Sequence, residues 1–103
     1  MKLLTKEVIE TLKKNKAGGS DPLCAVHFFN PAGPGDWFAI SLNEKTGIAF
    51  GYVSIFGDWN DELGDFSMQE LIDFKGTFGL GIERDLGWSP TPLSEVKEKY
   101  TKR

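Results

Sequence analysis

WFAISLNEKTGIAFGYVSIF, from Trp37 to Phe56, decides the fold because it encodes two strands that a short loop joins. The segments 37–42 and 48–56 are rich in β-branched and aromatic residues, which favour extended chain. Between them, NEKTG has the length of a hairpin loop, and Gly47 suits the turn. The sequence therefore predicts antiparallel pairing of these two strands.

Side chains alternate between the two faces of a strand, so Phe38, Ile40 and Leu42 are predicted to share one face. By the same rule, one face of the second strand carries Ile48, Phe50, Tyr52 and Phe56. A further strand is predicted at 23–29, LCAVHFF, before the longer turn NPAGPGD. A short fourth strand is predicted at 81–88.

Three segments carry the chemistry of helix starts. Thr5 is expected to be the N-cap of a first helix within LLTKEVIETLKKN. In FSMQELIDFKG, Ser67 begins an S-x-x-E capping box, which predicts a short helix at 68–75. Thr91 is expected to cap a last helix, with Pro92 at its first position. The apolar face of that helix is formed by Leu93, Val96 and Tyr100.

The order of these elements predicts a single α+β domain over residues 1–103. The chain has 103 residues, 40% hydrophobic and 26% charged, which is the size and composition of one globular domain. Short links between the strands favour an antiparallel sheet of three to four strands. We expect three helices to pack against this sheet and to cover one of its faces.

The chain is predicted to be cytoplasmic. Charged residues at Lys6, Glu7 and Glu10 interrupt the apolar start MKLL, so it does not have the pattern of a secretion signal. The sequence contains no apolar run of about 18 residues, which predicts no membrane span. Cys24 is the only cysteine and cannot form an intrachain disulfide, which fits a reducing compartment.

Charge is distributed unevenly along the chain, whose net charge is −3. Residues 1–16 carry +3 and residues 84–103 carry +2, whereas residues 17–83 carry −8. Nucleic-acid binding needs clustered Lys and Arg to replace counterions, so binding through the body of the domain is disfavoured. The basic termini leave one alternative, an accessory protein that contacts nucleic acid through its ends.

The usual catalytic and cofactor patterns are not found. Cys24 and His27 are three residues apart on a predicted strand, so they are expected on opposite faces and not as a nucleophile and base. Two such residues are too few for a zinc site. The glycines of KGTFGLGIERD run in the reverse order of the dinucleotide fingerprint and follow a helix. We therefore assign no cofactor, no metal and no catalytic residue.

The acidic run GDWNDELGD lies between the hairpin and the second helix. Read as a calcium loop from Asp58, it has Leu63 where the turn needs glycine. Three interpretations stay open: a solvated loop leading to the Ser67 cap, an irregular cation site, and an anionic patch for a basic partner. The candidate binding residues of this run are Asp58, Trp59, Asp61 and Glu62.

A second candidate group lies in GIERDLGWSPTPLSEV. If 81–88 is extended, Glu83 and Asp85 share one face, and Arg84 and Trp88 share the other. Paired carboxylates can serve as acid and base, or can simply occupy a wet face. Arg84 is expected either to bind a partner or to hold the loop in place.

The chain resembles a known family in four segments: LLTKEV, the hairpin WFAISLNEKTGIAFGYV, ELGDFSMQEL and, most specifically, LGIERDLGWSPTPLSE. This is the bacterial domain-of-unknown-function family 2958, whose members resemble short proteins frequent on phages, plasmids and other mobile elements. The resemblance implies no activity and supplies no catalytic residue. Its strongest pattern covers Glu83, Arg84, Asp85, Pro90, Thr91 and Pro92.

The leading hypothesis is a non-enzymatic protein–protein interaction module of a bacterial mobile element, with a role in host interaction or anti-defence. Its partner is an unidentified protein, expected to be basic because the central segment is acidic. Trp59, Trp88 and Arg84 are the expected anchors, since interfaces favour aromatic and Arg residues. The alternative is a small enzyme or ligand-binding module at 83–85 with His27, which predicts a concave pocket where these side chains converge.

Overall fold

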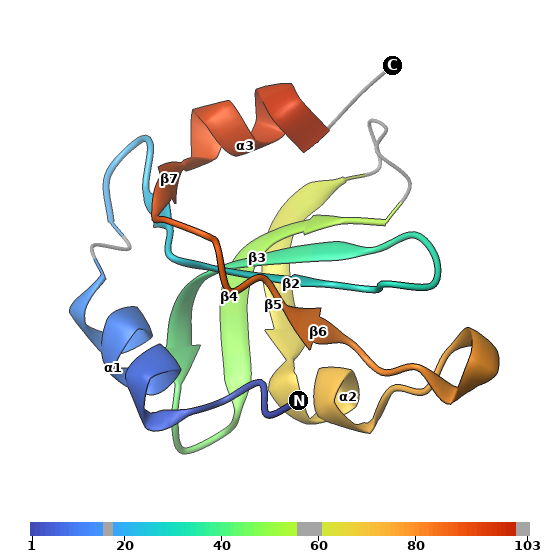
Figure 1. Cartoon of the computed structure of the whole chain (residues 1–103). Helices are drawn as coiled ribbons and strands as arrows, with labels where there is room; N and C mark the ends of the chain where they lie inside the picture. The colour runs from blue at the N-terminus through green and yellow to red at the C-terminus, as the bar shows by residue number, and fades with distance from the viewer. Residues whose placement is uncertain (16–17, 56–60, 101–103) are drawn as a thin grey trace.

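The computed structural model describes residues 1–15, 18–55 and 61–100. It shows an α+β domain with a five-stranded antiparallel sheet in the order β5-β4-β3-β2-β6 and a two-stranded pair, β1-β7 (Figure 1). The elements are α1 (Lys6–Lys14), β1 (Leu23–Cys24), β2 (Val26–Phe29), β3 (Asp36–Asn43), β4 (Ile48–Ser54), β5 (Glu62–Ser67), α2 (Met68–Asp73), the 3₁₀ helix η1 (Thr77–Gly79), β6 (Glu83–Arg84), β7 (Thr91–Pro92) and α3 (Leu93–Tyr100).

The α+β class is confirmed, but the main sheet has five strands where three to four were expected. The difference comes largely from β5, which pairs along β4 from Val53↔Glu62 to Ile48↔Ser67. This segment was interpreted as part of an acidic loop because only two of its residues, Leu63 and Phe66, are apolar. An edge strand needs fewer apolar residues, since its outer side is open to water.

The predicted hairpin is confirmed, and its loop is closed by local hydrogen bonds. β3 and β4 pair from Asp36↔Ser54 to Asn43↔Ile48. The side-chain oxygen of Asn43 accepts bonds from the amides of Lys45 and Thr46, at 3.0 and 3.3 Å. Gly47, with φ +72°, adopts the left-handed conformation that glycine takes at low cost.

A bulge in β3 overturns one predicted face. The register shifts between Ala39 and Ser41, so Ile40 is an extra residue in its strand. Phe38 and Ile40 pack on one side of the sheet, as predicted, but Leu42 packs with Ala49 on the other. The extra residue reverses the alternation beyond it. Phe56, predicted to extend the face of β4, lies outside the described residues.

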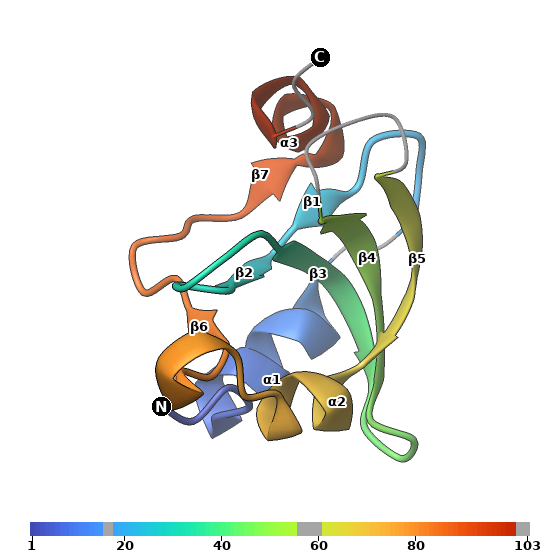
Figure 2. The same ribbon diagram turned by 90° about the vertical axis from the view of Figure 1, so that its right-hand side faces the viewer.

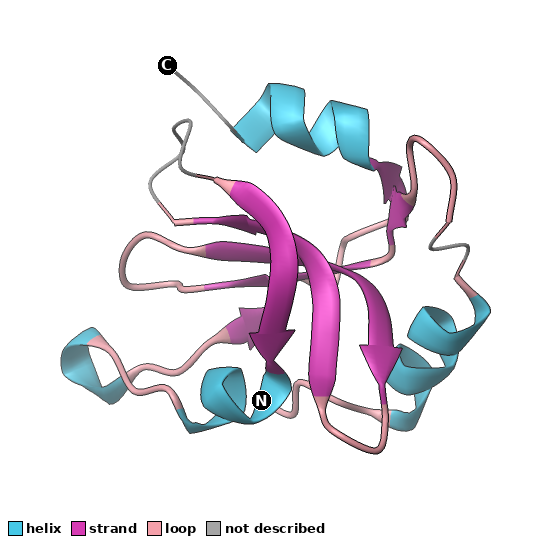
Figure 3. Ribbon diagram, turned by 180° about the vertical axis from the view of Figure 1, so that it is seen from behind, coloured by secondary structure: helices cyan, strands magenta, loops and turns pink. Residues whose placement is uncertain are grey.

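Helices cover both faces of the sheet, which corrects the expectation that they cover one. Figure 2 shows α3 on one side and α1 and α2 on the other, and Figure 3 shows the same separation from behind. The core beneath α1 and α2 includes Leu3, Val8, Leu12, Val26, Phe28, Ala39, Met68 and Leu71. The core beneath α3 contains Cys24, Phe38, Ile40, Tyr52, Leu93 and Val96. β3 presents apolar side chains to both sides, so both faces require a cover.

Two of the three predicted helix caps are confirmed. The hydroxyl oxygens of Thr5 and Ser67 accept bonds from the amides of Val8 and Glu70, both at 3.2 Å. The helix that follows Ser67 ends at Asp73, two residues before the predicted end. None of the helices in the described ranges is long and apolar enough to cross a membrane.

The predicted cap of the last helix is wrong. Thr91 and Pro92 form β7 against β1, and the Thr91 hydroxyl donates to the Ser89 carbonyl at 2.8 Å. The cap comes instead from Asp21, whose two carboxylate oxygens accept bonds from the amide and hydroxyl of Ser94 at 2.8 and 2.7 Å. The pairing of β1 with β7 brings this distant carboxylate to the start of α3.

Candidate functional site

His27 lies in β2, between β3 and β6, and its side chain faces α3. The amide of Ala25 donates to the Ala39 carbonyl while Val26 also pairs with Ala39, so the chain has an irregularity between β1 and β2. Ala25 and Val26 therefore both pack on the α1 side, and Cys24 and His27 both lie on the α3 side. The expectation that these two residues occupy opposite faces is wrong.

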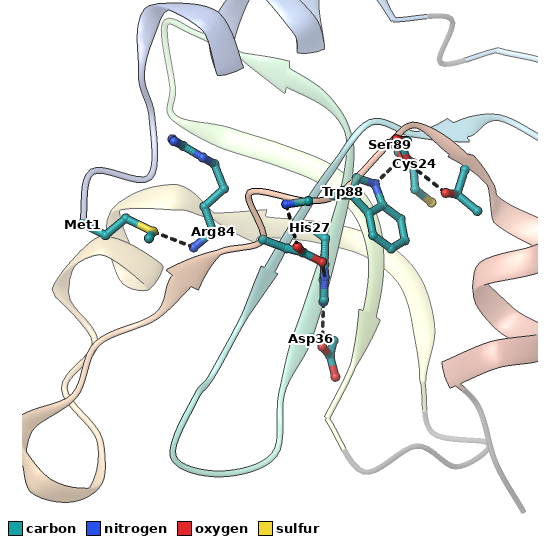
Figure 4. Close-up of polar contacts among 10 residues, drawn as sticks. Met1, Cys24, His27, Asp36, Arg84, Trp88 and Ser89 are labelled. Carbon is teal, nitrogen blue, oxygen red and sulfur yellow. Dashed lines mark hydrogen bonds and ion pairs between the residues drawn. The ribbon is translucent and has the colours of Figure 1, made fainter.

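Cys24 and His27 nevertheless do not form a pair of nucleophile and base. Its side chain is 0% exposed, and burial, aided by the charge of Asp21, raises the pKa of the thiol to about 12. The thiolate is the reactive form of cysteine, and this one stays protonated at neutral pH. The Trp88 indole N–H donates to the Cys24 carbonyl at 3.0 Å (Figure 4).

A carboxylate holds each ring nitrogen of His27. Nε2 lies 2.6 Å from Asp36 Oδ1, and Nδ1 lies 3.0 Å from Asp85 Oδ2 (Figure 4). The His27 side chain is 7% exposed, whereas those of Asp36 and Asp85 are 30% and 34% exposed. Both contacts are within hydrogen-bond distance, so the two carboxylates hold the imidazole from opposite sides of its ring.

Aromatic rings enclose the imidazole. It stacks on Phe38 with ring centroids 4.4 Å apart and planes inclined by 6°. Trp88 and Tyr100 pack around it at tilted angles, with centroids 5.1 and 5.7 Å away. These rings and the two carboxylates together fix the position of the imidazole.

The turn after β6 fixes Asp85 beside His27. β6 pairs with β2, and the Asp85 amide donates to the His27 carbonyl at 2.9 Å. The second oxygen of Asp85 accepts a bond from the Gly87 amide at 3.1 Å. Because both oxygens of Asp85 are engaged, its role is to orient the imidazole. Asp36, at the first position of β3, contacts His27 Nε2 through Oδ1.

His27 and its two acids line a pocket of about 520 Å³. The walls come from β2, the turn before β3, the end of β4 and the last residue of α3. Among the described residues that line it, Asp36 and Asp85 carry carboxylates beside His27, and none is Lys or Arg. Burial and the charges of Asp36 and Asp85 raise the pKa of the Tyr100 phenol, which also lines the pocket.

A family described as protein of unknown function, DUF2958, matches residues 3–101 of the 103-residue chain. The chain belongs to the DUF2958 family. No curated protein and no solved structure matches it. The DUF2958 match covers every residue that lines the His27 pocket.

The DUF2958 structure separates the three residues expected to converge. Asp85 lies at the His27 pocket, whereas Glu83 lines a different pocket beside the N-terminal segment. The Arg84 guanidinium donates to the Lys2 carbonyl at 2.9 Å. The backbone amide of Arg84 lies 3.1 Å from Met1 Sδ (Figure 4). Arg84 thus contacts the N-terminal segment of the chain, whereas the structural interpretation expected it to hold its own loop in place.

Trp88 departs from its predicted position. It was expected to share a face with Arg84, but it packs with Asp85 around His27. The strand ends at Arg84, and residues 85–88 form a turn in which the Trp88 amide donates to the Asp85 carbonyl at 3.3 Å. A turn does not follow the alternation of a strand.

The acidic candidates are dispersed. Asp61 accepts a hydrogen bond from the Ser54 hydroxyl at 2.7 Å, and Glu62 is exposed at the start of β5. Asp58 and Trp59 lie outside the described residues. The described ranges hold no group of three or more His, Cys, Asp or Glu side chains arranged to bind a metal ion.

Asp36 and Tyr100 are site residues that sequence reasoning missed. The pairing of β2 with β3 sets His27 opposite Phe38 and so places Asp36, two residues earlier, on the same face. A prediction of that register would have found Asp36. Tyr100 was assigned to the apolar face of the last helix, and no pattern in the sequence pointed to its position beside His27.

Proposed function

We propose that this DUF2958 protein is a binding module whose His27 pocket receives a positively charged side chain, Lys or Arg, from a protein partner. The observation that carries the proposal is the pair of partly exposed carboxylates at the mouth of a pocket whose described lining holds no Lys or Arg. Two carboxylates outnumber the one positive charge that an imidazole can carry, so the site is negative in either protonation state of His27. A basic partner is also what the acidic central segment predicts.

The shape and walls of the pocket suit such a side chain. Phe29 and Tyr100 line it and offer aromatic faces, which attract Lys and Arg heads. Asp36 lies at the boundary between the buried imidazole and the opening, where a guanidinium or ammonium can donate to its carboxylate.

The described residues support binding more than turnover. The Cys24 thiol has a raised pKa, and the Ser54 hydroxyl donates to Asp61 instead of to His27. A nucleophile activated by a base needs a direct hydrogen bond between the two, and neither residue has one with the imidazole. The alternative of an enzyme at 83–85 has less support because Glu83 lines a different pocket from Asp85 and the Arg84 guanidinium donates to the Lys2 carbonyl.

Binding of nucleic acid through the basic termini also has less support. The helices that carry lysines of these termini, α1 and α3, lie on opposite faces of the sheet (Figure 2). Lys13 of α1 forms an ion pair with Glu44 at 3.0 Å. Host interaction or anti-defence on a bacterial mobile element is one form of the present proposal, and the family resemblance is what suggests it.

The test is a titration followed by two-dimensional NMR with the amides of acetyl-arginine and acetyl-lysine. We expect saturable shifts at His27, Phe29 and Tyr100, and none with the amide of acetyl-citrulline, which has the shape of arginine without its charge. Asp36→Asn is expected to weaken binding by about 1 kcal/mol, roughly fivefold, because the contact is partly exposed.

Asp73→Asn is the matched control, since it removes the same charge from an exposed position on α2 outside the pocket. Equal shifts with the citrulline and arginine amides would overturn the proposal. So would an equal loss of affinity in the two variants, which would indicate only the net charge of the chain.

A further inference from the structure

The loop that follows α2 holds an aromatic side chain out in solvent. Phe78, in η1, is 93% exposed. The loop is closed by its own backbone bonds: the Gly76 amide donates to the Leu80 carbonyl at 2.8 Å, and the Gly79 amide to the Gly76 carbonyl at 2.9 Å. Figure 1 shows this orange loop projecting from the body of the domain.

Phe78 also has an unusual backbone conformation. Its φ of +61° and ψ of +19° are left-handed, and it is the one non-glycine residue with positive φ in the described chain. Residues with a Cβ adopt this conformation at a cost that glycine does not incur. The backbone bonds of the loop hold this conformation, but within one chain the exposed ring gains little burial to offset its cost.

A pocket of about 540 Å³ with both polar and apolar lining lies beside the same loop. Gly79 and Leu80 line this pocket and Phe78 does not, so the Phe78 ring does not fill it. Three of the side chains that line the pocket, Ile72, Phe74 and Leu80, are themselves 40–47% exposed. The apolar wall is formed by Leu3, Leu4, Ile72, Phe74, Leu80 and Ile82.

We propose that the occupant of this pocket is Phe78 of a second copy of the chain. Phe78 comes directly before two residues that line the pocket, so a two-fold axis beside this loop can bring each ring to the apolar wall of the pocket in the other copy. Such a two-fold contact ends at the dimer, and it places both Phe78 rings in the two pockets. A partner of another kind would have to supply its own apolar group and leave Phe78 uncovered or covered separately.

The charges around the pocket favour self-association. Lys2, Lys75 and Glu83 line it, so the face carries both signs of charge. A two-fold contact can set Lys75 near Glu83 of the second copy, whereas a face of one sign would repel its own copy. The face is small beside the roughly 800 Å² per partner of a standard interface, so we expect a weak dimer with a dissociation constant on the order of 10 μM or above.

The test is sedimentation velocity over roughly a hundredfold range of protein concentration, because dimer formation follows mass action. The sedimentation coefficient of the unaltered protein is expected to rise with concentration. Phe78→Gly is expected to remain monomeric throughout and to melt no lower than the unaltered protein, because glycine suits the φ of this position. Its unchanged melting temperature separates a lost contact from a lost fold.

Leu86→Gly is the matched control, since Leu86 is 73% exposed in a different turn and outside this pocket. It is expected to dimerise as the unaltered protein does. A concentration-independent monomer for the unaltered protein would overturn the proposal, and so would a Phe78→Gly dimer of unchanged affinity. Flotation of the unaltered protein with anionic lipid vesicles that requires Phe78, without self-association, would assign the ring to a membrane surface instead.

Discussion

Substitution of Gly51 by alanine tests how closely β3 and β4 approach at the bulge. Gly51 lies in β4, opposite Ala39 on one side and Gly64 on the other. A Cβ at Gly51 would lie 1.9 Å from the Phe38 carbonyl oxygen and 2.9 Å from its carbonyl carbon. These are backbone atoms of a central strand, so no side-chain rotation can relieve the overlap.

The expected cost is about 3 kcal/mol in the free energy of unfolding. Adding a methyl group to a packed core costs about 1–3 kcal/mol where side chains can adjust, and here the strands themselves must separate. For a domain of this size, 1 kcal/mol corresponds to about 4–8 °C, so the melting temperature should fall by about 12–24 °C. The separation of the strands would also displace Phe38, on which His27 stacks.

Thermal unfolding followed by circular dichroism measures this change. Gly64→Ala is the matched control, since Gly64 pairs with Gly51 across the sheet and a Cβ there would meet nothing within 4 Å. We expect its unfolding free energy to stay within about 0.5 kcal/mol of the unaltered protein. A Gly51→Ala protein that melts within about 4 °C of the unaltered one would refute the close approach of the strands.

Three further predictions concern a phenol and two helix starts. The pKa of Tyr100 is raised by burial and by Asp36 and Asp85, so a titration of phenolate absorbance should show it ionising above the ordinary value of about 10, and Asp36→Asn should lower it. The unfolded chain loses this proton first, so the tyrosine should lower stability as pH rises above about 10. Ser67→Ala should cost about 1 kcal/mol in urea unfolding through the lost cap of α2, and Ser67→Asp should retain the cap. Hydrogen bonds from Ser94 lower the pKa of Asp21, so its contribution to stability should be present above its ordinary pKa of 3.8 and be lost as pH falls through the lowered value; Asp21→Asn should remove that dependence.

Each of these has an outcome that contradicts it. An unchanged Tyr100 titration in Asp36→Asn would mean that the carboxylate does not act on the phenol. Ser67→Asp and Ser67→Ala proteins of equal stability would remove the capping argument. For Asp21, an acid unfolding profile that is identical in the Asn variant would show that the link between Asp21 and Ser94 does not contribute.

The parts of the fold that could be predicted depend on contacts between residues only a few positions apart in the sequence. The hairpin loop is closed by Asn43 and Gly47, and the Thr5 and Ser67 caps each bond the amide three residues ahead. The cap of α3 could not be predicted in this way, because Asp21 lies 73 residues from Ser94. Thr91 matched the local pattern equally well, and long-range pairing decided against it.

Two irregularities in the strands account for the errors about faces. The extra residue at Ile40 moves Leu42 to the other side, and the irregularity at Ala25 brings Cys24 and His27 to the same side. Neither has a glycine or proline to mark it. Strand alternation assumes an unbroken ladder, so a single unmarked bulge inverts every later assignment in that strand.

The candidate site was predicted in part for the same reason. Asp85 and His27 were both considered, but their contact depends on the pairing of β6 with β2 across 58 positions. Asp36 is nine positions from His27 and was read as the end of a turn. The site is assembled by sheet register and by the packing of α3, which no local pattern specifies.

Cys24 makes the α3 side of the sheet accessible to kinetic measurement. It is the only cysteine of the chain, it is fully buried beneath α3, and it requires no introduced label. A thiol reagent can reach Cys24 only when that layer opens. The rate of modification therefore reports how often the layer opens. If α3 lifts alone, modification will be faster than global unfolding; if the two cores open together, the two rates will coincide.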